Sequence, residues 1–141
     1  MPAAIGARLA IRVNAALSLG YTVLMAEAGL AAHGHGFDPA IGYLHALDFG
    51  RPSLACDLAE PLRPVIDRFT WRLFAEQIPR ARDFSVERDG ACLLMKAGRE
   101  RFYERIEEPL VEARKRLNAM LQALREMIRE NQDAGALPDR L

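Results

Sequence analysis

The chain has 141 residues, which is enough for one domain with a buried core but too few for an enzyme of two domains. Half of the residues are hydrophobic and 27% are charged, as is usual for a soluble globular protein. The 19 Lys and Arg residues balance the 19 Asp and Glu residues, so the net charge excludes a strongly basic or acidic protein and indicates no partner.

The first predicted element is a helix from Val13 to about Ala32, which is rich in Ala and Leu and has hardly a polar face. A helix that is apolar on most of its faces is usually buried on most of its sides. We therefore expect this helix at the centre of the fold, with other elements packed around it.

The same stretch also has features of a signal peptide or a membrane span. Two arginines precede it and "AEA" ends it, as in a signal-peptidase site. Polar residues inside it make a poor signal segment, and Glu27 interrupts a run already short for a bilayer, which needs about 20 apolar residues. The two cysteines, Cys56 and Cys92, have neither C-x-x-C spacing nor the number of a disulfide framework. We therefore expect a cytoplasmic protein with no membrane partner.

Turn residues and caps divide the next part of the chain. "HGHGFDP" ends the first helix, and Asp38 as N-cap with Pro39 at the first helical position predicts a short helix through residues 41–45. A loop follows. The D-x-x-E pattern of Asp57 and Glu60 then matches a capping box, which predicts a helix from there to about Gln77.

The last third of the chain predicts a small hairpin and a long helix. Residues 80–95 hold a D-G turn between two short apolar runs, which favours a hairpin or an irregular crossover. From Lys96 to about Gln132, apolar residues recur every three or four positions, as on the core face of a helix. Pro109 should kink or restart this helix, since an interior proline costs about 3 kcal/mol.

Together these elements predict an all-α fold. It is a single helical domain with a buried central helix, a long C-terminal helix and at most a small hairpin around residues 84–95.

Asp57, Glu60 and His45 are the candidate metal ligands. The two carboxylates lie one helical turn apart, so their oxygens can converge on one hard cation. With the histidine they make a mixed nitrogen and oxygen ligand set that suits Mn²⁺ and is tolerated by Mg²⁺. The alternative interpretation, favoured by the residue types alone, is that the carboxylates only form the capping box.

Two long segments resemble a known family. "NAALSLGYTVLMAEAGLAAHGHGFDPAIGYLH" and "GRPSLACDLAEPLRPVIDR" are similar to the C-terminal helical domain of the universal CRISPR-associated integrase. The family signature contains "N-x-x-L-S-x-G-Y", "D-P-A-I-G-F/Y-L-H" and "G-R-P-S-L-x-x-D-L-x-E-P-x-R-P", which both segments match almost throughout. A later stretch, "DGACLLMKAGRERFYERIEE", resembles the loop and final helix of the family, so the resemblance covers nearly all of residues 13–130.

The resemblance implies a divalent ion, Mg²⁺ or Mn²⁺, held by a glutamate, a histidine and an acidic residue. The histidine matches His45 and the acidic ligand matches Glu60, with Asp57 as a supporting carboxylate. The family glutamate has no counterpart here. Glu27 is a candidate substitute, although an ion pair between Glu27 and an arginine is the favoured interpretation.

The resemblance also implies a function and partners. Family members insert short pieces of foreign DNA into a repeat array together with a small CRISPR-associated partner protein, in antiviral defence. Residues 1–141 would be equivalent to the catalytic helical domain, without the N-terminal β-sheet domain. We therefore expect a truncated or split DNA endonuclease or integrase, whose missing parts come from a separate chain, and a homodimer is among the expected assemblies. The alternatives are a non-catalytic helical remnant and a DNA- or protein-binding module.

The resemblance also implies DNA contact, for which the candidate residues are Arg63, Arg68 and Arg72. Arg80 and Arg82 add to the local excess of positive charge. Arginines suit phosphate groups, although helical arginines are more often only solvated. Trp71 lies among them. Its spacing from Phe69 and Phe74 favours a place in the core over base stacking.

Overall fold

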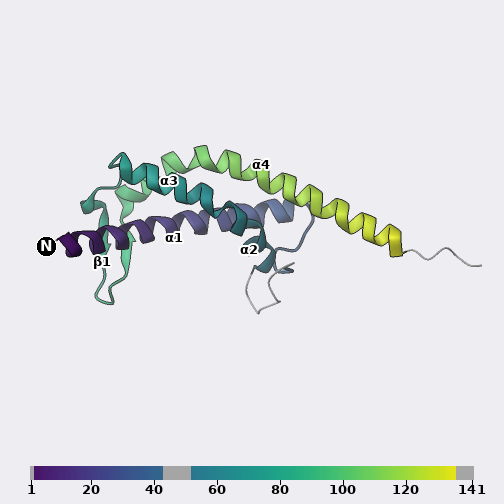
Figure 1. The fold of residues 1–141 in the computed structure, drawn as a ribbon, viewed down its shortest axis with the longest axis horizontal. Helices are drawn as coiled ribbons and strands as arrows, with labels where there is room; N and C mark the ends of the chain where they lie inside the picture. The colour runs from purple at the N-terminus through teal and green to yellow at the C-terminus, as the bar shows by residue number, and fades with distance from the viewer. Residues whose placement is uncertain (1, 43–51, 136–141) are drawn as a thin grey trace, which may run out of the picture.

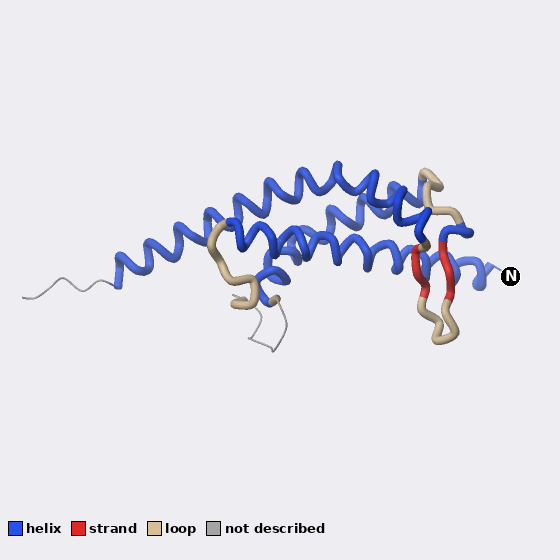
Figure 2. Tube along the Cα trace, turned by 180° about the vertical axis from the view of Figure 1, so that it is seen from behind, coloured by secondary structure: helices blue, strands red, loops and turns tan. Residues whose placement is uncertain are grey.

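The computed structural model describes residues 2–42 and 52–135 of the chain. Its elements are α1 (Pro2–Gly34), α2 (Ser53–Ala59), the 3-10 helix η1 (Glu60–Leu62), α3 (Arg63–Ala75), the 3-10 helix η2 (Ala81–Asp83), β1 (Phe84–Val86), β2 (Cys92–Leu94) and α4 (Lys96–Gly135). The helices form an elongated bundle in which α1 runs below α3 and α4, and the hairpin lies at one end (Figures 1 and 2). The predicted all-α fold with one small hairpin is confirmed.

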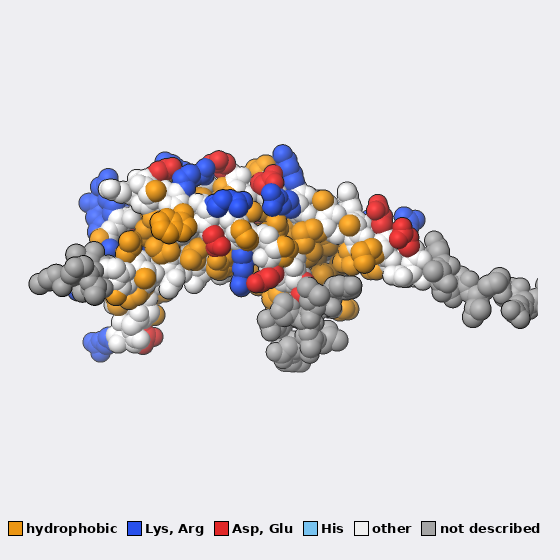
Figure 3. Space-filling view, viewed as in Figure 1, with side chains coloured by type: hydrophobic (Ala, Val, Ile, Leu, Met, Phe, Trp, Pro, Cys, Tyr) orange, Lys and Arg blue, Asp and Glu red, His pale blue; other side chains and the backbone are white. Residues whose placement is uncertain are grey.

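Helix α1 is central but is buried along one stripe only. It contacts α2, α3, α4 and β2. The fully buried residues recur every four positions and are mostly small: Ala16, Gly20, Leu24, Ala28 and Ala32. The opposite stripe is exposed, with Leu30 at 69%, and hydrophobic side chains stay on the surface of the bundle between charged ones (Figure 3). The predicted burial on most sides is therefore wrong, because the partners of α1 all lie along one stripe.

Helix α1 is also unusually long and apolar. Residues Gly6–Gly34 are long and apolar enough to cross a membrane, a property that core helices of soluble proteins share. In this fold α1 packs against three other helices and the hairpin. The helix also begins at Pro2, well before the predicted start at Val13.

Gly20 sets how closely α1 approaches α3. A Cβ atom at this position would lie 2.5 Å from Cγ2 of Ile66 and 3.5 Å from the ring of Phe102 on α4. Ile66 is fully buried, so its side chain has no room to move away. The missing side chain of Gly20 therefore lets α1, α3 and α4 meet at one point.

The start of α2 is capped by a carbonyl group from a distant turn. The backbone N–H groups of Leu54 and Ala55 donate to the carbonyl oxygen of Pro39, at 2.8 and 3.4 Å. Asp38 holds that turn, since its carboxylate accepts the N–H of Ala40 at 2.9 Å. The predicted short helix at residues 41–45 lies almost entirely outside the described residues.

The predicted capping box of Asp57 and Glu60 is wrong. Helix α2 begins at Ser53, so Asp57 lies in its middle, and Glu60 begins the following 3-10 helix. The first N–H groups of a helix need an acceptor, and here the Pro39 carbonyl is that acceptor. The two carboxylates are therefore not needed as caps.

The hairpin agrees with the sequence prediction. β1 and β2 pair antiparallel, with Phe84 opposite Leu94 and Val86 opposite Cys92. At the turn, Gly90 has a φ of 88°, a conformation that suits glycine. The carboxylate of Asp89 accepts the N–H of Ala91 at 3.0 Å.

Helix α4 continues through Pro109. It runs over 40 residues from Lys96 to Gly135 with the proline inside it. Of the two predicted outcomes, a kink or a restart of the helix, the restart is therefore wrong. Leu110, Ala113, Leu117 and Leu121 are buried beyond the proline, and this packing offsets the lost backbone hydrogen bond.

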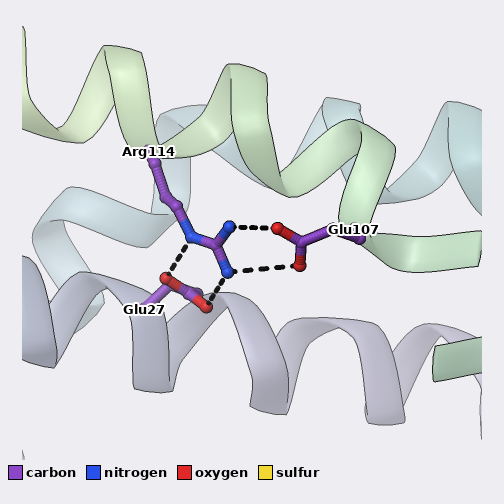
Figure 4. A network of polar contacts seen from close by, with 3 residues as sticks. All are labelled: Glu27, Glu107 and Arg114. Atoms are coloured by element: carbon purple, nitrogen blue, oxygen red, sulfur yellow. Dashed lines mark hydrogen bonds and ion pairs between the residues drawn. The ribbon is translucent and has the colours of Figure 1, made fainter. Parts of the chain in front are cut away.

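An ionic network joins α1 to α4 (Figure 4). Both carboxylate oxygens of Glu27 accept hydrogen bonds from Arg114, at 2.7 and 2.8 Å, and Arg114 also donates to Glu107 at 2.5 Å. The Glu27 side chain is only 19% exposed. The hydrogen bonds and positive charge of Arg114 outweigh the effect of burial and lower the pKa of Glu27. The predicted ion pair of Glu27 with an arginine is confirmed.

We expect Gly20→Ala to lower the free energy of unfolding by about 1 to 3 kcal/mol, since the new methyl group overpacks the contact with Ile66. Urea denaturation measures the change. Gly29→Ala on the same helix is the matched control: a Cβ atom at that position would have nothing within 4 Å, so this variant should be neutral or stabilising by up to about 1 kcal/mol. Equal effects of the two variants would contradict a close α1–α3 approach.

The Glu27 network predicts a pH dependence of stability. Because the pKa of Glu27 is lower in the folded than in the unfolded protein, its contribution is present above its ordinary pKa of 4.5 and is lost as the pH falls through the lower folded value. The wild type should therefore exceed Glu27→Gln in stability near pH 7, and the difference should shrink toward about pH 3. Urea midpoints at both pH values test this, and a constant difference would show that the charge of Glu27 contributes nothing.

Candidate functional site

Asp57 and Glu60 line one groove on the surface of the bundle. The groove has a volume of about 490 Å³. Besides Asp57 and Glu60, it is lined by Leu54, Leu58 and Pro61 and by Met120 and Leu124 of α4. Asp57 is half-buried, whereas the side chain of Glu60 is 59% exposed. The structure thus brings these two predicted ligands to one place. His45, the third predicted ligand, lies outside the described residues.

Glu60 takes part in a polar chain that reaches back to α1. Nη1 of Arg63 lies 3.3 Å from Oε1 of Glu60, and the Arg63 guanidinium lies over the ring of Tyr21, 4.9 Å from its centroid. The Tyr21 hydroxyl donates to the carboxylate of Asp67. This hydrogen bond, burial and the negative charge of Asp67 together raise the pKa of Tyr21. These polar contacts hold the Arg63 side chain beside the groove.

Sequence reasoning missed most of this polar chain. The Glu60–Arg63 pair is readable from its i,i+3 spacing. Tyr21 and Asp67 are 46 residues apart, and no local pattern links residues at such a separation. Tyr21 does stand in the "N-x-x-L-S-x-G-Y" segment, which was a signal for its importance but not for its partner.

The donor set of the groove partly fits a divalent cation. Two carboxylates supply the oxygen ligands that Mg²⁺ and Mn²⁺ accept. Within residues 2–42 and 52–135, no group of three or more His, Cys, Asp or Glu side chains is placed to hold a metal. Glu60 also pairs already with Arg63, so a cation has to compete with a guanidinium. Glu27 does not join this set, because Arg114 occupies both of its oxygens.

The three predicted DNA-binding arginines differ in their surroundings. Arg63 is held beside Glu60. Arg72 forms a two-point contact with Glu108, at 2.7 and 3.2 Å. Arg68 is exposed and makes no ion pair in the described part of the chain, although it lines a hollow of about 340 Å³ together with Arg72 and Glu108. Paired charges attract phosphates less, so Arg68 is the most available of the three.

Trp71 is 76% exposed, so its predicted place in the core is wrong. Two residues along a helix correspond to a rotation of about 200° around its axis, so the two side chains point to nearly opposite faces. Phe69 faces inward and packs edge-on against Phe102, with centroids 5.3 Å apart, and Trp71 therefore faces outward.

Residues 11–108 match the family described as "CRISPR associated protein Cas1". A CRISPR-associated endonuclease Cas1 of Thermodesulfovibrio yellowstonii is 39% identical over 122 residues, which cover 86% of this chain and 38% of that protein. Another from Rhodospirillum rubrum is 46% identical over 88 residues, covering 62% of this chain and 26% of that protein. The chain thus spans well under half the length of these relatives.

Solved structures show the same likeness. A Cas1 protein from Thermotoga maritima superposes with a TM-score of 0.73 at 28% identity, covering 79% of this chain and 37% of that one. A casposase bound to an integration product superposes with a TM-score of 0.66 at 28% identity, covering 70% of this chain and 27% of that one. The resemblance that the motifs predicted is confirmed, and the chain belongs to the Cas1 family of CRISPR-associated proteins.

Proposed function

We propose that this chain acts in CRISPR spacer acquisition as the helical, metal-binding part of a DNA endonuclease or integrase. The observation that carries the proposal is the meeting of Asp57 and Glu60 on one groove in a member of the Cas1 family. The relatives described as endonucleases support a nuclease, and the casposase bound to an integration product supports an integrase.

In this proposal Asp57, Glu60 and His45 hold Mg²⁺ or Mn²⁺. Such an ion, when bound, stabilises the negative charge that develops on the oxygens of a phosphoryl group. The chain's own contribution is to present oxygen ligands from α2 and η1 and to keep Arg63 beside them. A guanidinium in that position binds the phosphate of a DNA strand and orients it toward the groove.

The site as described is short of ligands. The glutamate that the family resemblance implies has no matching residue in this sequence, and Glu27 is held by Arg114. We propose that residues 1–141 act as the equivalent of the catalytic helical domain, and that a further glutamate ligand completes its metal site. A small CRISPR-associated partner protein, a homodimeric assembly and a cytoplasmic location complete the proposal.

The second candidate function is a non-catalytic DNA- or protein-binding module. The Glu60–Arg63 ion pair favours it, because a carboxylate already paired with an arginine needs no metal. The exposed Trp71 and Arg68 also favour it, since both are available to a partner. Metal binding distinguishes the two functions.

We expect weak Mn²⁺ binding that depends on the proposed ligands. Losing even a residue that supports a metal ligand typically costs about 10- to 100-fold in affinity, so Glu60→Gln, Asp57→Asn and His45→Ala should each weaken binding at least about tenfold. Calorimetric titration measures the affinity. Glu112→Gln is the matched control, because Glu112 is an exposed glutamate that pairs with Arg116 at 2.9 Å on α4. Identical isotherms for all variants would refute the metal site.

We expect the isolated chain neither to cleave branched DNA nor to join a 3′-hydroxyl to a repeat at an appreciable rate. The reason is the missing ligand: a misplacement of about 1 Å in a catalytic group costs about 100-fold in rate. Adding a separately expressed segment with the β-sheet domain and the glutamate should restore activity.

The measurement for this prediction is a gel assay of labelled branched DNA with Mn²⁺ or Mg²⁺. It compares the chain alone, the chain with the added segment, and His45→Ala in both conditions. Robust turnover by the chain alone that His45→Ala abolishes would show that the ligands within the 141 residues suffice. No turnover even with the added segment would favour the binding module.

A further inference from the structure

A turn after the end of α1 joins the two walls of the groove that Asp57 and Glu60 line. One wall of the groove belongs to α2 and η1, and the other belongs to α4. Residues 35–40, which we call the bridging turn, are hydrogen-bonded both to α4 and to α2. They belong to the loop that lies beside α2 in Figure 2. The bridging turn therefore ties one wall of the groove to the other.

His35 attaches the bridging turn to α4 through two contacts. Nε2 of its half-buried imidazole lies 2.9 Å from Oδ1 of Asn118, and the imidazole donates because an amide oxygen can only accept. The guanidinium of Arg125 donates to the carbonyl oxygen of His35. Asn118 and Arg125 lie about two helical turns apart on α4, and the groove residues Met120 and Leu124 come between them. Both contacts are thus made beside the α4 wall.

Pro39 attaches the bridging turn to α2. Its carbonyl oxygen accepts the N–H groups of Leu54 and Ala55, and Leu54 itself lines the groove. Asp57 follows Leu54 by about one helical turn on α2. A displacement of the buried Pro39 therefore displaces the α2 wall together with its carboxylate.

The backbone of the bridging turn is itself fixed between His35 and Pro39. The N–H of Phe37 donates to the carbonyl oxygen of Ala32 at 2.9 Å, and its side chain packs against the hydrophobic core. Gly36 has a φ of 80°, which a residue with a Cβ atom adopts only with strain. A link with so few free torsions transmits a change at one end to the other end.

We propose that His35 is a positioning residue for the Asp57–Glu60 groove, because its contacts with α4 set the distance between the two walls. Oxygen ligands bind Mg²⁺ only at about 2.0 to 2.1 Å, so a small shift of α2 alters how well a cation fits. His35 acts through the bridging turn and touches no ligand. The proposal rests on the proposed function only for the metal, since the position of α2 is measured without one.

The test follows amide hydrogen exchange of Leu54 and Ala55 by NMR, because their N–H groups report on the contact with Pro39. His35→Ala and Asn118→Ala each remove the hydrogen bond between the two side chains. Each should speed exchange at both amides about two- to tenfold, the range for one lost hydrogen bond. His35→Gln should restore slow exchange, because its amide nitrogen replaces Nε2 as the donor to Asn118.

His33→Ala is the matched control. His33 is the same residue type in the same segment, but its exposed side chain makes no hydrogen bond to α4 within the described residues. This variant should exchange like the wild type. The amides of Phe69 and Leu73, two buried residues of α3, are the internal reference and should keep their wild-type rates in every variant.

A titration with Mn²⁺ connects the bridging turn to the metal site. His35→Ala should weaken the affinity about threefold, less than the loss expected for a residue that contacts a metal ligand directly. His35→Gln should recover the affinity, and His33→Ala should not change it. A recovery by glutamine distinguishes the donor at this position from the bulk of the imidazole ring.

Three results would overturn the proposal. One is unchanged exchange at Leu54 and Ala55 in both His35→Ala and Asn118→Ala. Another is an equal increase in His33→Ala or at the α3 reference amides, which would mean general loosening. The third is wild-type Mn²⁺ affinity in His35→Ala while the wild type binds the ion. A wild type that binds no Mn²⁺ refutes the proposed function instead, and faster exchange that His35→Gln reverses still supports the role of His35.

Discussion

The architecture depends on the close contact of α1 with its neighbours along a stripe of small residues. Gly20 leaves no space for even a methyl group beside Ile66, and Ala16, Ala28 and Ala32 continue the stripe in both directions. Small side chains let helix axes approach closely, so that dispersion contacts accumulate over the length of the helix. The helices α2, α3 and α4 all pack against α1.

Two charged clusters of the bundle are organised by different kinds of packing. Asp57 and Glu60 stand on short helical segments, of which α2 packs against α1 and η1 packs against α2 and α3. At the hairpin end of the bundle, in contrast, one buried carboxylate, Asp83, orients Arg101. The first cluster holds two carboxylates, one of them paired with Arg63, and the second holds a carboxylate paired with Arg101.

Much of this fold was readable from the sequence, because it comes from local patterns. The recurrence of apolar residues every three or four positions predicted α4, and the D-G turn predicted the hairpin. The failures have a shared cause in tertiary contacts. The carbonyl of Pro39 replaced the side-chain cap expected from Asp57, and packing beyond Pro109 kept α4 continuous. For the site, Asp57 and Glu60 share one groove, as their short spacing predicted.

The rest of the site was beyond local patterns. The hydrogen bond between Tyr21 and Asp67 and the contact of Arg101 with Asp83 join segments distant in sequence.

The cap of α2 has a further consequence for motion. A helix of seven residues is unstable by itself, so α2 persists only while the turn at Pro39 and the bundle hold it. Local opening of that turn would dismantle the groove lined by Asp57 and Glu60 at a lower free energy than global unfolding, while the contact of Arg101 with Asp83 at the far end of the bundle stays intact.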